Sequence, residues 1–130
     1  MKTIKVIIDW DKNFGAASED IPGCVATAKT VEAVKKAYVS ALKFHIEGLE
    51  KNELPKILHG RYKLEFELSA QALLQSVDGI ITRAALSRVT NINERQLGHY
   101  ITRHRIPKPE QRNKIVHGIN IIANRLKEVV

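Results

Sequence analysis

Several acidic residues in this sequence are of a type that supports nuclease chemistry. Asp9 and Asp11 alternate with apolar residues near the start, Glu65 and Glu67 do so later, and Glu32 lies between the two segments. Carboxylates grouped on a sheet can hold two Mg²⁺ ions for phosphodiester cleavage. The same alternation is also typical of a solvated strand face, and this second interpretation is favoured. We therefore expect no enzymatic activity, no metal site and no cofactor, while Mg²⁺-dependent ribonuclease activity that requires Asp9 stays an open alternative.

Cysteine and histidine offer other chemistry, for which the spacing is unfavourable. Cys24 is the only cysteine and follows Pro22-Gly23 in an apolar context, which favours a small buried residue over a nucleophile. His99 and His104 are five residues apart, so a helix would not place both on one face and no zinc site is expected. His45 falls on an apolar helical stripe and is expected to be packed and hydrogen-bonded.

The positive charge of the chain is concentrated in its second half, which points to a polyanionic partner. The formal net charge is +7. Residues 1–68 contain 11 Lys and Arg against 10 Asp and Glu, whereas residues 69–130 contain 10 against 4. A compact basic half indicates binding to nucleic acid or to an anionic membrane surface. A merely soluble basic surface is the plainer alternative.

Residues 83–103 match the requirements of a helix-turn-helix, in which two short helices cross steeply around a tight turn. Ser87 is small where the second helix must approach, and Asn91 suits a turn position that requires positive φ. The apolar anchors of this pattern are Leu86, Ile92, Leu97 and Tyr100. An ordinary helical hairpin is the alternative.

In a helix-turn-helix, the second helix lies in the major groove and reads base edges. The expected base-reading residues are Asn93, Glu94, Arg95, His99 and Thr102. Arg95 would reach guanine and Glu94 would accept from cytosine, while Gly98 would let the helix approach the duplex closely. The expected phosphate contacts are Arg83, Arg88, Arg103, His104, Arg105 and Lys108.

The elements that must position these side chains form two predicted domains of an α+β protein. Residues 1–68 read as β-β-β-α-β, with strands near 4–10, 14–18, 24–29 and 62–68 and a helix capped by Thr30 that runs to Leu49.

Residues 69–130 read as four helices, the first three capped by Ser69, Thr82 and Asn93, with Gln96 as a capping-box partner of Asn93. Pro109 suits the first turn of the last helix. Its apolar residues recur at alternating spacings of four and three from Ile115 to Val129, which fits either a dimer seam or packing back onto the domain.

The start of the chain contains no signal-peptide pattern, and no segment approaches the length of a membrane helix. We expect a cytoplasmic protein.

The first 50 residues resemble HicB antitoxins. The resemblance rests on a leading strand, on Asp20-Ile21-Pro22-Gly23-Cys24, and on Thr30 before an Ala/Lys-rich helix. It departs from the family at Ala28, where many relatives carry Gly, and in the plain second strand 14–17. It implies a non-catalytic partial RNase H-like domain followed by a helix-turn-helix DNA-binding domain. It also implies a protein partner, the HicA toxin, which is a small mRNA endonuclease with an active-site histidine.

The function expected on these grounds is that of an antitoxin that neutralises a HicA-like toxin and represses its own operon by binding operator DNA as a homodimer or larger homo-oligomer. The alternative is a stand-alone transcription regulator whose N-terminal domain oligomerises or senses a ligand. A short toxin gene beside this one would distinguish the two.

Overall fold

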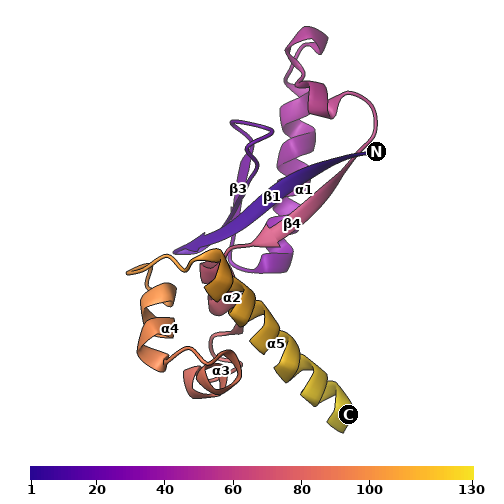
Figure 1. Ribbon diagram of the computed structural model, residues 1–130. Helices are drawn as coiled ribbons and strands as arrows, with labels where there is room; N and C mark the ends of the chain where they lie inside the picture. The colour runs from indigo at the N-terminus through magenta and orange to yellow at the C-terminus, as the bar shows by residue number, and fades with distance from the viewer. The chain divides into compact units, whose positions relative to one another are not determined.

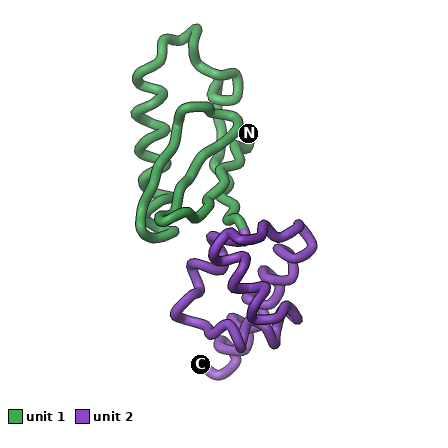
Figure 2. Tube along the Cα trace, turned by 90° about the vertical axis from the view of Figure 1, so that its left-hand side faces the viewer, with its two compact units in different colours: residues 1–69 green, residues 70–130 purple.

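The computed structural model describes all residues 1–130, and the chain divides into two compact units, Met1–Ser69 and Ala70–Val130 (Figure 2). It confirms an α+β protein in which a four-stranded mixed sheet precedes a helical segment. None of its helices combines the length and the apolar character that crossing a membrane requires.

The sheet of the first unit contains three antiparallel strands and one parallel strand in the order β3-β2-β1-β4. β1 (Lys2–Asp11) and β2 (Asn13–Ala17) are antiparallel, and Lys12 turns between them with φ 69°. β3 (Val25–Ala28) pairs with β2, and β4 (Tyr62–Leu68) runs parallel to β1. Parallel pairing of β4 requires a crossover, which the helix between β3 and β4 provides.

That helix, α1 (Val31–Glu47), covers one face of the sheet (Figure 1). Thr30 begins it by accepting a hydrogen bond from the backbone N–H of Ala33 at 3.1 Å, as expected. Its buried residues are Val34, Tyr38 and Leu42. The strand β1 contributes Ile4, Val6 and Ile8, each fully buried, to the same unit. The side chains buried by period-two alternation on β1 and by helical spacing on α1 thus form one apolar core.

The connection between α1 and β4 is partly regular. It contains two short 3₁₀ helices, η1 (Lys51–Glu53) and η2 (Lys56–Leu58). Glu50 and Glu53 form a capping box around η1, because the Glu53 carboxylate accepts from the backbone N–H of Glu50 at 3.0 Å. Leu58 is buried and ties the connection to the core of the unit.

The second unit contains only helices: α2 (Ala70–Val77), α3 (Arg83–Thr90), α4 (Glu94–Ile101) and α5 (Pro109–Val129). Every helix contributes to one core, whose buried residues are Ala70, Leu74, Leu86, Ile92, Leu97, Tyr100 and Ile115. Burying one leucine or isoleucine of this kind contributes about 1.5–3 kcal/mol. This core therefore fixes how α3 and α4 cross.

Candidate nucleic-acid interface

The turn between α3 and α4 has the conformation that the sequence predicts. Asn91 ends α3 in the left-handed region, with φ 59° and ψ 28°. Its backbone N–H donates to the carbonyl of Ser87 at 2.9 Å. The three residues between the helices reverse the chain, and the buried Ile92 anchors them to the core.

A buried threonine satisfies the polar backbone groups of this turn. The Thr90 hydroxyl donates to the carbonyl of Leu86 at 2.6 Å and accepts from the backbone N–H of Ile92 at 3.2 Å. Thr90 is only 4% exposed, so an unpaired hydroxyl or amide there would be costly. Sequence reasoning did not identify Thr90, because a threonine near a helix end also fits many exposed positions.

Both helices begin with capping residues at the expected positions. Thr82 accepts from the backbone N–H of Ala85 at 3.1 Å, and Asn93 accepts from that of Gln96 at 2.8 Å. The expected capping-box role of the Gln96 side chain is wrong. Its amide instead donates to the Tyr100 hydroxyl at 3.0 Å, and the Gln111 amide donates to the same hydroxyl at 3.3 Å. This arrangement links α4 to the start of α5.

Four of the five expected base-reading residues are exposed and His99 is half-buried, but they lie at different parts of α4. Asn93, Glu94 and Arg95 are in its first turn, and Arg95 shares a helical face with His99. The Asn93 side-chain oxygen is used in capping, which leaves its amide N–H group for a ligand. Thr102 belongs to the other end, where its hydroxyl donates to the carbonyl of Gly98 at 3.1 Å.

Gly98, which is expected to let α4 approach DNA closely, also lies beside a side chain of α3. A Cβ atom built at Gly98 would lie 3.1 Å from the Arg83 guanidinium. Gly98 therefore makes room for an α3 side chain across the helix pair. Arg83 therefore lies against α4, and its charge is beside the helix that is expected to enter a DNA major groove.

The chain after α4 folds back and brings two histidines together. Arg103 adopts positive φ, and the Arg105 N–H donates to the carbonyl of His99 at 3.2 Å. The rings of His99 and His104 then lie 5.4 Å apart, centroid to centroid. Helical spacing did not predict this proximity, because it depends on the turn. Desolvation lowers the pKa of His99 below its ordinary 6.5, and His104, Arg95 and Arg105 add to the effect.

The expected phosphate-contacting residues are all exposed, but they do not form one group. Arg105 and Lys108 line a hollow beside Gln96, Tyr100 and Gln111. Arg88 instead lines a groove between α3 and α5. The structure therefore gathers the cations on and after α4, and it separates Arg88 from them.

Three of the carboxylates considered for nuclease chemistry have other partners in the structure. Asp9 accepts from the Ser69 hydroxyl at 2.6 Å, Glu67 pairs with Lys5 at 2.9 Å, and Glu32 pairs with Lys36 at 3.5 Å. No group of three or more His, Cys, Asp or Glu side chains could hold a metal ion.

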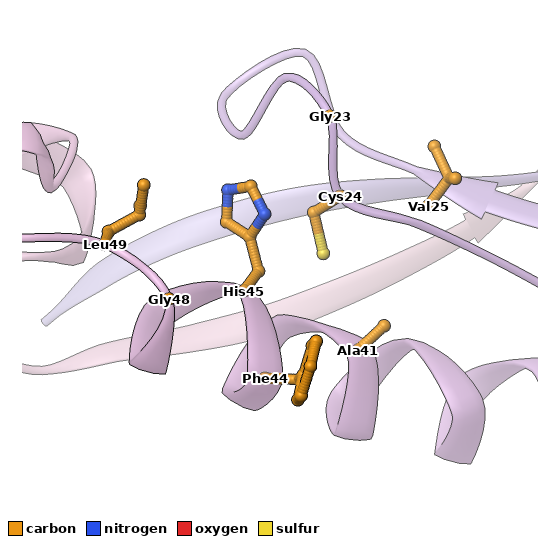
Figure 3. A pocket seen from close by; sticks show the side chains of 8 residues that line it. All are labelled: Gly23, Cys24, Val25, Ala41, Phe44, His45, Gly48 and Leu49. Carbon is orange, nitrogen blue, oxygen red and sulfur yellow. The ribbon is translucent and has the colours of Figure 1, made fainter.

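A pocket of about 410 Å³ opens in the first unit between the start of β3 and the end of α1 (Figure 3). Cys24 points from the turn toward α1, and the His45 ring rises from α1 toward Gly23. Burial raises the pKa of the Cys24 thiol, so it is protonated at neutral pH and weakly nucleophilic. His45 is half-buried, and its ring forms no hydrogen bond, contrary to expectation.

Comparison with protein-family models gives no match, and comparison with curated proteins gives no significant match either.

Proposed function

We propose that this chain is an antitoxin-type repressor whose residues 70–130 bind operator DNA through a helix-turn-helix formed by α3 and α4. The observation that carries the proposal is the left-handed Asn91 between two capped helices, with Arg95 and His99 facing outward from the second. A turn of this kind lets the second helix enter a major groove while the first crosses the backbone. The excess of ten cations over four acidic residues in this half supports an attraction to phosphate.

Two arginines in this region should affect DNA binding in different ways. On this proposal Arg95, in the first turn of α4, reads a base edge, and its replacement by alanine should cost about 1–3 kcal/mol at one base pair. Arg103, after the helix, contacts phosphate, which carries no sequence information.

Fluorescence anisotropy on the chain's own promoter and on scrambled DNA tests this difference. Arg95→Ala should reduce the difference in affinity between promoter DNA and scrambled DNA. Arg103→Ala should weaken binding to both DNAs equally. Lys36→Ala, on the solvent side of α1 in the first unit, is the control and should change neither affinity. If both arginine variants bind promoter DNA like the unaltered chain, the helix-turn-helix proposal fails.

The first unit supports the other half of the proposal, in which residues 1–68 form a partial RNase H-like domain that holds a HicA-like toxin. Its three antiparallel strands, crossover helix and fourth, parallel strand agree with the architecture that the Pro22-Gly23-Cys24 resemblance implies.

The sheet face opposite α1 is a suitable surface for a protein partner. Lys5, Ile7 and Glu65 are exposed there, and Val25 on the edge strand β3 is 64% exposed. An edge strand offers unpaired backbone groups as well as side chains to a partner.

Co-expression with the product of a short neighbouring gene tests this half of the proposal. The neighbouring protein should stop growth when expressed alone, and this chain should restore growth and co-purify with it. Ile7→Asp should abolish rescue, while Lys36→Asp on the solvent side of α1 should preserve it. A neighbouring protein that is harmless alone would contradict the antitoxin function.

The pocket beside Cys24 favours a second candidate, a stand-alone regulator that senses a small ligand. Its lining is mostly apolar and includes Phe44 and Leu49. In that case the chain would bind its promoter with an affinity that changes with a metabolite, and no toxin would be encoded nearby.

A further inference from the structure

The two halves of α5 have different surroundings, although one apolar pattern runs through both. In the first half, Ile115 and Gly118 are buried, and Ile119 and Ile122 pack partly against the core of the unit. Every residue from 123 to 129 is exposed, and the yellow end of α5 projects away from α2, α3 and α4 (Figure 1). The first half of α5 thus packs onto its own unit, as one interpretation of the apolar spacing predicts. The second half is exposed and is available for the dimer seam that the other interpretation predicts.

The exposed half continues the apolar stripe with large side chains. Leu126 and Val129 follow Ile122 at spacings of four and three, so all three share one face of α5. Leu126 is 58% exposed and Val129 is 81% exposed. Exposed apolar side chains that continue a buried stripe mark an interaction surface more strongly than scattered ones.

A groove of about 390 Å³ lies next to this stripe, between α3 and α5. Ala85, Val89, Ile121 and Ile122 provide its apolar lining, and Arg88 and Arg125 add positive charge. Neither arginine forms an ion pair within the chain. The groove therefore combines an apolar lining with two arginines that no carboxylate of the chain neutralises.

The exposed end of α5 has the complementary chemistry. Beside Leu126 and Val129 it carries Glu128, the only acidic residue after Glu110. Helical spacing places Glu128 on the flank that also carries Ile121 and Arg125. Glu128 forms no ion pair within the chain. Protruding apolar side chains, an apolar groove and opposite charges thus occur on one surface of the molecule. A two-fold axis would bring each of these features against its counterpart on a second copy.

We propose that two copies of this chain associate through this surface, with Leu126 and Val129 of each copy in the α3–α5 groove of the other and Glu128 facing Arg88. The inference deepens the proposed function, because an operator-binding protein with a helix-turn-helix reads two half-sites as a dimer. Using α5 and the outer side of α3 leaves α4 free for DNA. It also gives Arg88 a role other than phosphate contact.

Sedimentation velocity of the full chain without DNA tests the surface. The unaltered chain should be a dimer at micromolar concentrations. Leu126→Asp should weaken the dimer at least about tenfold, because it removes an apolar contact and buries a charge. Asn124→Asp adds the same charge to the opposite face of α5 and should leave the dimer intact. Because both positions are exposed, circular dichroism should show that both variants are folded.

Charge reversal tests the orientation of the two copies. Glu128→Arg and Arg88→Glu should each weaken the dimer, and the double variant should recover most of the loss, which general destabilisation would not do. A monomeric unaltered chain, a Leu126→Asp dimer of normal affinity, or no recovery in the double variant would overturn the proposal. DNA affinity is measured separately, so a dimer that dissociates as described but binds no promoter DNA would refute the repressor function and leave this surface standing.

Discussion

The reversal between α3 and α4 depends on the backbone conformation of Asn91. Asparagine tolerates positive φ better than any other residue with a side chain beyond Cβ, and glycine tolerates it without steric cost. The residue's backbone N–H closes the turn on Ser87, so the position tolerates little change of conformation.

Asn91→Ala should lower the free energy of unfolding by about 1 kcal/mol, because alanine has no local polar compensation for the left-handed conformation. Asn91→Gly should be close to neutral. Urea denaturation followed by circular dichroism would measure both. Equal losses in the two variants would mean that the asparagine side chain, and not the φ angle, is what the turn requires.

The pKa of His99 lies below its ordinary 6.5 in the free chain. A neighbouring DNA phosphate would favour the charged ring, so binding should take up a proton between the free and bound pKa values. Affinity for promoter DNA should therefore rise as the pH falls from about 7.5 to about 6, by at most about tenfold per unit.

His99→Gln should flatten this pH dependence, and His117→Gln on α5 is the control. An unchanged slope in His99→Gln would show that this histidine does not face phosphate. The stability of the folded chain also depends on the protonation of His99. The unfolded chain binds the proton more readily, so the contribution of His99 to stability is present above pH 6.5 and is lost as the pH falls below it. Binding must therefore be measured where circular dichroism shows a folded chain.

Among the helices, α3 and α5 approach each other closely at Gly118. A Cβ atom at Gly118 would lie 2.6 Å from Thr90 Cγ2 and 3.0 Å from Val89 Cγ2. The close crossing holds the end of α3, and with it the turn, against α5.

Gly118→Ala should therefore lower the free energy of unfolding by about 1–3 kcal/mol through overpacking. Gly98→Ala is the matched control, because its new methyl group meets only the movable end of Arg83. There the better helix propensity of alanine should leave stability unchanged or raise it by up to about 1 kcal/mol. Thermal unfolding of both variants would show the contrast, and equal effects would contradict a tight α3–α5 crossing.

The sequence predicted most elements and caps, since alternation, helical spacing and the residues Thr30, Thr82 and Asn93 are local signals. It did not predict Gly118 as the contact point of α3, or the meeting of His99 with His104. Both depend on residues brought together by the fold. The predicted role of Gln96 was wrong for the same reason, because its amide donates to the Tyr100 hydroxyl, to which the Gln111 amide also donates.

At the scale of the whole molecule, charge is divided unevenly between the two units. Residues 1–68 are nearly neutral, and the excess of cations belongs to residues 69–130. Salt should therefore weaken DNA binding through the second unit alone.

Promoter affinity should fall steeply with salt, and the slope of log K against log salt should decrease by about 0.9 for each phosphate contact removed. Arg103→Ala should reduce the slope by about this amount, and Lys36→Ala in the first unit should leave it unchanged. Anisotropy titrations at several salt concentrations would measure the slopes. A reduced slope in Lys36→Ala would assign phosphate contacts to the first unit as well.

The chain passes from β4 to α2 through a single residue, Ser69, whose backbone N–H donates to the Ile8 carbonyl and whose hydroxyl donates to Asp9. A protease needs a stretch of exposed, pliable backbone to seat in its cleft, and this junction offers none. Digestion would start elsewhere, for example in the connection that precedes β4. A protease would consequently not release residues 70–130 as a fragment of their own by cutting at this junction.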